Sequence, residues 1–241
     1  LVFERLPETK TEIDNITALL RAHNYGNPAV YEGDEGTEES FKALSGKRTS
    51  IIHLATHGSY ITPTAAEKQR KRDVMNRLTF LRSGDDRQSS EEDEALTRSF
   101  LVMSGGKMLW TSDSIPEGVD DGLLTAQEIS RLDLRGCDLA VLSACETGLG
   151  DISSEGVMGL QRGFKKAGVQ SIVMSLWKVA DRPTQEFMTE FYRHLTAGEG
   201  KRTSFLAAQC FLKEKYPTNL PQDESRPPYW ASFILLDPEV R

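Results

Sequence analysis

The sequence predicts a three-layer α/β fold, in which helices cover both faces of a mostly parallel sheet. Two short, unbroken apolar runs, at 50–56 and 139–144, are typical of strands buried on both faces. Segments with helical spacing of apolar residues lie between the predicted strands, as parallel crossovers require. The chain has 241 residues with 38% hydrophobic content. We therefore expect one domain over 1–241.

The first predicted elements alternate between helix and strand. Helical spacing of apolar residues predicts an amphipathic helix over 7–21, with Glu8 near its start, where the helix dipole favours negative charge. A short strand is predicted at 29–31, then a helix with Thr37 as its N-cap, then the strand at 50–56. This order predicts a right-handed β–α–β unit.

Residues 62–98 interrupt this alternation, because the segment is rich in charge and poor in apolar residues. We expect a mobile surface insertion there. Its basic cluster, Lys68–Arg72, is either a solvated face or a self-cleavage site. A small hairpin through a Gly-Gly turn is expected next, with its arms at 100–106 and 107–110.

The second half of the chain is predicted to alternate strands and helices again. The strands are expected at 139–144, 171–177 and 230–236, and the helices at 125–132, from about 154 to Gly168, from Pro183 onward, and at 203–215. Gly168 is predicted to end its helix in the left-handed conformation. Phe187, Phe191 and Leu195 are expected to form the buried stripe of the helix that follows Pro183.

Composition excludes several classes of function. A net charge of −7 and a pI near 5.3 give no electrostatic footprint for nucleic acid. Three cysteines without close spacing predict neither a disulfide framework nor a zinc site and suit the cytoplasm, and we expect no cofactor. No apolar run reaches the length of a membrane span. The chain starts without methionine, so we expect a fragment of a larger protein.

Two of the predicted strands are followed in the sequence by a reactive residue and then, within three residues, by a glycine. The run at 50–56 leads to His57 and Gly58, and the run at 139–144 leads to Cys145. Ligand and catalytic groups gather at the carboxyl ends of parallel strands, so the thiol and the imidazole meet if the strands are neighbours. A nearby base favours the thiolate, which free cysteine barely populates at neutral pH. The pattern predicts a cysteine hydrolase.

The cysteines and His53 also have structural interpretations. The alternative for Cys145 is a small buried hydrophobe, but the polar, glycine-rich loop after it favours a nucleophile. His53 shares a strand face with His57, so a metal pair is an alternative, but a hydrogen-bonded core histidine is the more common role within a strand. We expect Cys137 at the opposite edge of the sheet and Cys210 on an apolar helix face.

Asp181 lies four residues beyond the predicted strand at 171–177. There it can present a carboxylate to a basic side chain of a substrate. It also precedes a predicted helix, where its charge is favourable without any ligand. The residues alone leave both roles open.

Five stretches in this order span most of the chain: His53–Gly58, Asp121–Ile129, Leu142–Gly148, Gly168–Asp181 and Tyr229–Phe233. Together they resemble the CHAT domain family. These are caspase-like peptidases of clan CD, related to separase and legumain and often attached to tetratricopeptide repeats. The resemblance implies a caspase-like α/β/α fold with a six-stranded, mostly parallel central sheet.

The resemblance also implies a thioester mechanism. His57 would assist Cys145 in attacking a peptide carbonyl, and the backbone N–H groups of Gly58 and Cys145 would hold the oxyanion. Water would then release the acyl group.

The resemblance to this family also implies a preference for particular substrates. Separases carry a run similar to Leu-Trp-x-Val-x-Asp, in which the aspartate is associated with a basic P1 residue, so Asp181 becomes the favoured specificity residue. Cleavage after Arg or Lys is expected. Trp177 and Glu146 belong to the matching stretches and are further candidates for substrate contact.

The expected partners are a protein or peptide substrate and a regulatory partner or tetratricopeptide-repeat region that controls activity. Two alternatives stay open. The first is a catalytically silent scaffold or binding module with the same fold, although intact His57, Gly58 and Cys145 weigh against it. The second is a cysteine hydrolase acting on a non-peptide ester or amide.

Overall fold

The structure is a computed structural model that describes residues 7–60, 96–104, 120–143, 151–153, 156–177, 179–217 and 228–238. At its centre is a four-stranded sheet with the order β1-β5-β8-β9. Its strands are β1 (Ile51–Ala55), β5 (Leu139–Ser143), β8 (Ser171–Ser175) and β9 (Phe233–Leu236). β1, β5 and β8 are parallel, and β9 is antiparallel to β8. The mostly parallel sheet is confirmed, but within the described residues it has four strands where six were expected.

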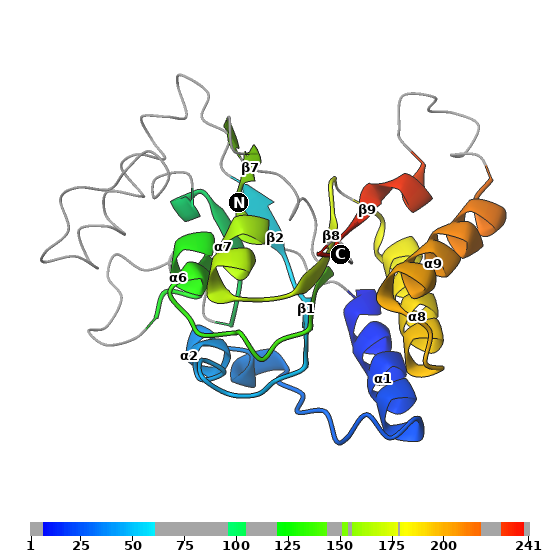
Figure 1. The fold of residues 1–241 in the computed structure, drawn as a ribbon, viewed down its shortest axis with the longest axis horizontal. Coiled ribbons are helices and arrows are strands. Elements are labelled where there is room, and N and C mark those ends of the chain that lie inside the picture. The colour runs from blue at the N-terminus through cyan, green and yellow to red at the C-terminus, as the bar shows by residue number, and fades with distance from the viewer. Residues whose placement is uncertain are drawn as a thin grey trace, which may run out of the picture.

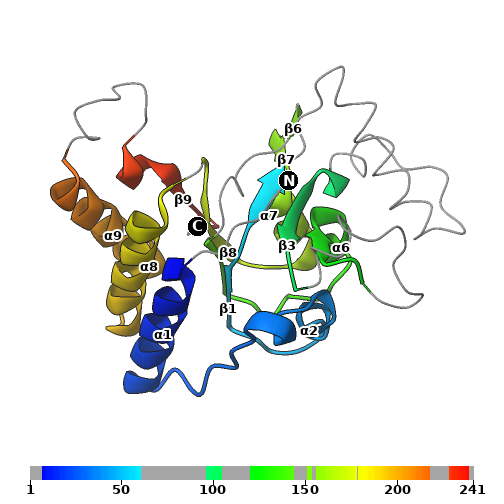
Figure 2. The ribbon, with the colours of Figure 1, turned by 180° about the vertical axis from the view of Figure 1, so that it is seen from behind.

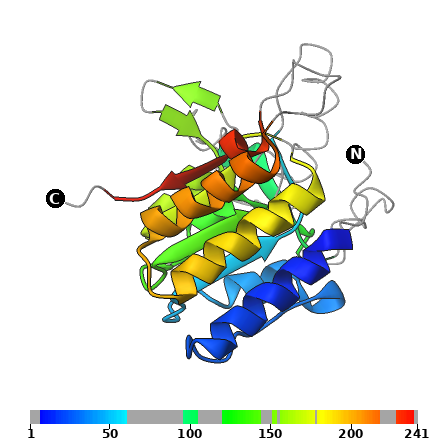
Figure 3. The same ribbon diagram turned by 90° about the vertical axis from the view of Figure 1, so that its right-hand side faces the viewer.

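Helices cover both faces of this sheet (Figure 1). On one face α1, α8 and α9 run side by side, as Figure 3 shows. These helices span Pro7–Ala22, Asp181–Thr196 and Lys201–Lys215. On the other face lie α2 (Glu38–Lys42), α6 (Ala126–Ser130) and α7 (Leu160–Ala167). The three-layer prediction is therefore confirmed.

Alternation along the strands divides the core in two. Ala140, Leu142 and Met174 belong to the cluster that includes residues of α2, α6 and α7. Their neighbours Val141 and Val173 belong to the cluster that includes residues of α1, α8 and α9. Because successive side chains of a strand point to opposite faces, each of these strands contributes to both layers.

Two smaller sheets accompany the central one. β2 (Gly58–Tyr60), β3 (Ser99–Val102) and β4 (Leu123–Thr125) form an antiparallel sheet in the order β2-β3-β4, seen from behind in Figure 2. β6 (Asp151–Ser153) and β7 (Gly156–Met158) form an antiparallel pair. Two 3-10 turns, at Gly33–Glu35 and Tyr229–Ser232, complete the described elements.

Several local predictions are confirmed by the helix ends. The Thr37 hydroxyl accepts a hydrogen bond from the Ser40 backbone N–H at 3.1 Å, as an N-cap does. The helix predicted over 125–132 is present as the shorter α6, and Thr125 is its N-cap, through a reciprocal pair of hydrogen bonds with Glu128 that was not predicted. Gly168 ends α7 with a φ of 101°, a conformation that favours glycine.

Other local predictions are wrong. Residues 29–31 form no strand, and Tyr31 is 52% exposed, so the expected β–α–β unit does not begin there. The helix expected from about 154 starts at Leu160, because 156–158 pairs with 151–153 instead. The segment 230–236 opens with a 3-10 turn before β9.

The hairpin expected after residue 99 is only partly described. β3 is a strand, but its hydrogen-bonded neighbours are β2 and β4. The predicted second arm at 107–110 lies outside the described residues, as does nearly all of the expected insertion at 62–98. At the end of that insertion, Leu96 is fully buried in the core.

An ion-pair cluster around Lys42, here called the Lys42 cluster, joins α2 to the chain between 120 and 128. The Nζ atom lies 2.9 Å from Glu38, 2.8 Å from Asp120 and 3.0 Å from Glu128. These three carboxyl groups lie close enough together to hold a metal ion. Lys42 already supplies the positive charge at their centre. A second carboxyl oxygen, Glu38 Oε1, accepts from the Gly122 N–H at 2.6 Å.

Burial raises the pKa of Glu38 to about 8, against the lowering effect of Lys42 and with added repulsion from Glu128 and Asp121. Burial disfavours the charge on Lys42 as well, but hydrogen bonds to the surrounding carboxyl groups raise its pKa overall. Burial therefore makes the negative charge of Glu38 costly even beside Lys42.

None of the helices in the described part of the chain combines the length and the apolar character that a membrane crossing requires.

Candidate active site

The carboxyl ends of three neighbouring strands meet at one edge of the central sheet. β5 lies between β1 and β8. In the parallel register Ala55 pairs with Ser143, and Leu142 pairs with Met174. His57 follows Ala55 by two residues, and Cys145 follows Ser143 by two. The predicted adjacency of the two strands is confirmed, and the predicted nucleophile follows the central one.

His57 lies between the end of β1 and the start of β2. It is half-buried, and its backbone carbonyl accepts a hydrogen bond from the Val102 N–H at 2.8 Å. Gly58 begins β2 and pairs with Leu101. The central sheet before His57 and the smaller antiparallel sheet after it thus hold the backbone on both sides of this residue. Cys145 and Glu146 lie outside the described residues.

A small pocket opens at this same edge of the sheet. Its volume of about 30 Å³ exceeds the roughly 10–15 Å³ that one water molecule needs. The polar residues that line it come from two helices and the ends of three strands: Glu8, Thr9, Glu12, Thr56, Ser143, Ser175, Asp181 and Thr184. Three of these residues, Glu8, Glu12 and Asp181, carry carboxyl groups, and the other five carry hydroxyl groups, which both donate and accept.

Asp181 is the first residue of α8 and lines this pocket. The N-cap is Ala180, so the carboxylate does not act as the helix cap, although its charge is favourable in the first turn. The side chain is half-buried. Among the described residues, no hydrogen bond or ion pair engages it. The pocket therefore offers an unpaired carboxylate to a ligand.

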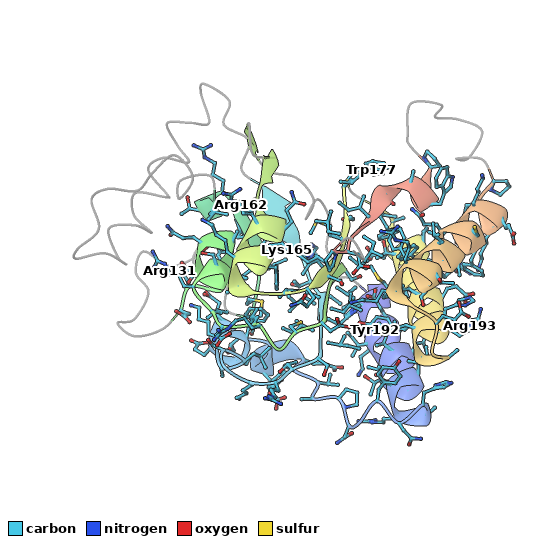
Figure 4. The ribbon with its side chains drawn as sticks, in the orientation of Figure 1. Arg131, Arg162, Lys165, Trp177, Tyr192 and Arg193 are labelled. Carbon is cyan, nitrogen blue, oxygen red and sulfur yellow. The ribbon has the colours of Figure 1, made fainter. Side chains whose placement is uncertain are left out.

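Three buried polar side chains form a row of hydrogen bonds next to the pocket. His53 Nε2 lies 2.8 Å from Glu12 Oε1, and His53 Nδ1 lies 3.2 Å from the Tyr192 hydroxyl. Glu12 is only 3% exposed and Tyr192 is fully buried, and burial raises the tyrosine pKa. Figure 4 places Tyr192 on the inner side of α8 and its neighbour Arg193 on the outer side. The expectation that His53 is a hydrogen-bonded core residue is confirmed.

Ser143, the last residue of β5, also lines the pocket. It is 7% exposed, and its hydroxyl oxygen is buried without a hydrogen-bond partner. Buried polar atoms are nearly always paired, so an orphan hydroxyl at a pocket calls for an explanation.

Sequence reasoning missed both Ser143 and Glu12. A usable signal existed for the serine, because strand period places it on the same face as the predicted nucleophile two residues later. Glu12 precedes the buried Ile16 by four residues, so helical spacing puts it on the apolar face of α1. A carboxyl group in that position is a candidate for a buried role.

The remaining predicted residues lie elsewhere. Trp177 sits two residues beyond β8, half-buried against the core cluster of α1, α8 and α9, near β9 in Figure 4. Cys137 is buried before the start of β5, at the opposite edge as predicted, and burial raises its pKa to about 11. Cys210 is exposed on α9, so its predicted place on an apolar face is wrong.

Comparison with known proteins agrees with this architecture. A model of the CHAT domain matches residues 1–237. The chain belongs to the CHAT domain family. This CHAT domain therefore falls within a caspase-like, protease-related group of proteins, and its central parallel sheet is consistent with that fold.

Two curated relatives of this CHAT domain are the mouse and human proteins named tetratricopeptide repeat protein 28. Each is 31% identical over 120 residues, which cover 49% of this chain. The match covers 5% of the mouse protein and 4% of the human one. The CHAT domain thus resembles a small part of two much longer proteins.

Proposed function

We propose that this CHAT domain, spanning 1–241, is a cysteine endopeptidase with Cys145 as nucleophile and His57 as base. The parallel register of β1 and β5 is the observation that carries the proposal. Ala55 and Ser143 are partners, and the two reactive residues follow them by the same offset. This shared offset from neighbouring strands supports the pairing of thiol and imidazole that an activated cysteine needs.

The acylation step balances without a cofactor. His57 takes the proton of the Cys145 thiol, and the sulfur forms a bond to the carbonyl carbon of the scissile peptide. The backbone N–H groups of Gly58 and Cys145 stabilise the oxyanion. The C–N bond then breaks, the imidazolium returns its proton to the leaving amine, and an acyl thioester remains.

The second step restores the enzyme. His57 takes a proton from water, whose oxygen attacks the thioester carbon. The C–S bond breaks, the imidazolium returns the proton to the sulfur, and a carboxylic acid leaves. One water is consumed for each peptide bond that is cleaved.

Asp181 sets a preference for Arg or Lys at P1 in this proposal. Its support is the unpaired, half-buried carboxylate in a pocket at the carboxyl edge of the sheet. A charge-assisted hydrogen bond from a basic side chain supplies both affinity and orientation. Trp177 and Glu146 are proposed to contact the substrate nearby.

The same proposal extends to regulation and location. Both relatives are named as tetratricopeptide repeat proteins, and we propose that a repeat region of this kind controls the activity of this domain. Free thiols at Cys137 and Cys210 fit a reducing compartment such as the cytoplasm.

The test is hydrolysis of fluorogenic peptides that end in Arg or Lys. Wild-type protein is expected to cleave them, Cys145→Ala to be inactive, and Cys210→Ala to retain full activity because that thiol lies on α9. A protein that binds peptides with Arg or Lys but cleaves none would instead be the silent binding module. Cleavage of simple esters without any peptide cleavage would favour the non-peptide hydrolase.

A further inference from the structure

The chain at His57 is held by one residue of β3, Val102. The Val102 N–H donates to the His57 carbonyl at 2.8 Å, and the Val102 carbonyl accepts a hydrogen bond from the Thr56 hydroxyl. Gly58, which follows the histidine, pairs with Leu101 of the same strand. Because β3 is bonded to three consecutive residues around the imidazole, a displacement of this strand would move the proposed base.

The end of β3 is held in turn by Gly122. The Met103 N–H, directly after Val102, donates to the Gly122 carbonyl at 2.8 Å. Gly122 is buried, and its φ of 79° is a conformation that favours glycine. It precedes Leu123, the first residue of β4, which pairs with Val102. The position of Gly122 therefore determines where the end of β3 lies.

The Lys42 cluster reaches this point through Glu38. The Gly122 N–H donates to Glu38 Oε1 at 2.6 Å, and Glu38 Oε2 lies 2.9 Å from Lys42 Nζ. The glutamate side chain is fully buried. A buried peptide N–H that loses its acceptor is costly, because water cannot replace the lost hydrogen bond. Glu38 therefore joins the cluster to the residue that holds the end of β3.

We propose that Glu38 is a positioning residue for His57, which it controls through Gly122 and β3. This inference rests on the proposed peptidase function, in which His57 is the base. It also gives a role to the stretch Asp121–Ile129, which is part of the family resemblance but supplies no catalytic group. The geometry of a catalytic group tolerates little change, since a misplacement of about 1 Å can lower a rate about 100-fold.

The first experiment compares Glu38→Leu with Glu38→Gln. Both variants remove the carboxyl group beside Lys42, but only glutamine offers Gly122 an acceptor oxygen. Glu38→Leu is expected to lower kcat about 10- to 100-fold with little change in KM, because the base moves and the substrate contacts remain. Glu38→Gln is expected to recover most of that loss. An unchanged kcat in Glu38→Leu, or equal losses in both variants, would overturn the inference and leave the peptidase function intact.

Two control variants separate positioning from general effects on the fold. Glu39, on the same helix, accepts from the Asp120 N–H at 3.3 Å but is exposed, so water can replace it. Glu39→Leu is expected to behave as wild type. Leu212→Ala removes a fully buried side chain from α9 in the opposite layer and measures how far kcat falls when stability alone is lost. A fall in either control as large as that in Glu38→Leu would overturn the positioning role.

A second variant keeps the test decisive if Glu38→Leu does not fold. Glu38→Asp keeps a carboxyl group beside Lys42 but shortens the side chain by a methylene group, which withdraws the acceptor from Gly122. A kcat about tenfold below wild type, again with little change in KM, supports the inference. A kcat equal to that of wild type contradicts it.

Hydrogen exchange separates this inference from the peptidase proposal. The exchange rates of the Val102 and Met103 amides are followed by NMR in the full chain. Exchange about tenfold or more faster in Glu38→Leu than in Glu38→Gln supports the positioning network, even if wild-type protein cleaves no peptide and the proposed function fails. Equal exchange rates in the two variants overturn the inference, whether or not peptides are cleaved.

Discussion

Ala55 and Ser143 are Cα partners in the parallel register of β1 and β5. The relationship matters because His57 and Cys145 each follow one partner by two residues. Ser143 also lines a pocket whose other walls are supplied by α1 and α8. One edge of the sheet therefore carries the pocket and the strand ends that lead to the predicted dyad.

Charge removal at Asp181 tests the specificity pocket. Asp181→Asn is expected to lower kcat/KM for basic P1 residues about 100-fold, because the substrate cation loses its charged partner. Cleavage of peptides with a neutral P1 residue should change little. Glu190→Gln, which removes a carboxylate paired with Arg193 elsewhere on α8, is the matched control. Equal losses for basic and neutral substrates would argue against a specificity role.

Lys42 is predicted to be essential for stability. Lys42→Met leaves three carboxyl groups without their shared cation, one of them almost fully buried, and should lower the free energy of unfolding by about 3 kcal/mol. Urea denaturation measures the change. Lys10→Met removes an exposed lysine with two ion pairs and should leave the midpoint nearly unchanged. A stable Lys42→Met protein would disprove the importance of the Lys42 cluster.

The pKa of Glu38 predicts a dependence of stability on pH. Its folded pKa, about 8, lies above its ordinary value of 4.5, so between these values the folded state binds a proton that the unfolded chain lacks. The stabilisation is complete below the ordinary value and disappears as the pH rises through the folded one. Urea midpoints should therefore fall between about pH 5 and pH 8 and then level off.

Two substitutions test whether Glu38 causes this pH dependence of stability. Glu38→Gln should flatten the dependence, whereas Glu39→Gln, at an exposed neighbour whose pKa is lowered, should retain it. An identical slope in Glu38→Gln would show that another group titrates.

Close packing of α6 against α7 depends on Gly163. A Cβ atom there would lie 2.5 Å from the Ala126 carbonyl oxygen, so Gly163→Ala should cost about 1–3 kcal/mol of unfolding free energy. Gly200→Ala is the control, because nothing lies within 4 Å of the added atom. Thermal denaturation compares the two variants. A Gly163→Ala protein as stable as the control would mean that the helices separate without cost.

Much of the fold could be predicted because local signals and burial agree. The stripe of Phe187, Phe191 and Leu195 is buried as predicted, since helical periodicity alone selects one face of α8. The strand expected at 29–31 failed because β-branched and aromatic residues promote a strand only when a partner edge is available. The helix α7 begins later than predicted for a related reason: residues 156–158 pair with 151–153 and form a strand where a helix was expected.

The site was predictable only in part. The two buried apolar runs could be recognised as strands, so the edge that carries His57 could be identified, but the structure was needed to show that the strands are neighbours. The pocket could not, because Glu12 reaches it from α1, more than 150 residues away from Asp181 in the chain. Such juxtapositions depend on how helices pack on the sheet, which residue spacing does not specify.

The most direct test of the central claim is the pH dependence of iodoacetamide alkylation at Cys145, quantified by mass spectrometry in wild-type protein and in His57→Gln. Cys137 and Cys210 report in the same digest as the buried and exposed internal controls. The account predicts that Cys145 reacts with an apparent pKa below that of free cysteine, about 8.5, and that loss of the imidazole raises this value by about one unit or more. An identical alkylation profile in the two proteins would contradict the pairing of His57 with Cys145.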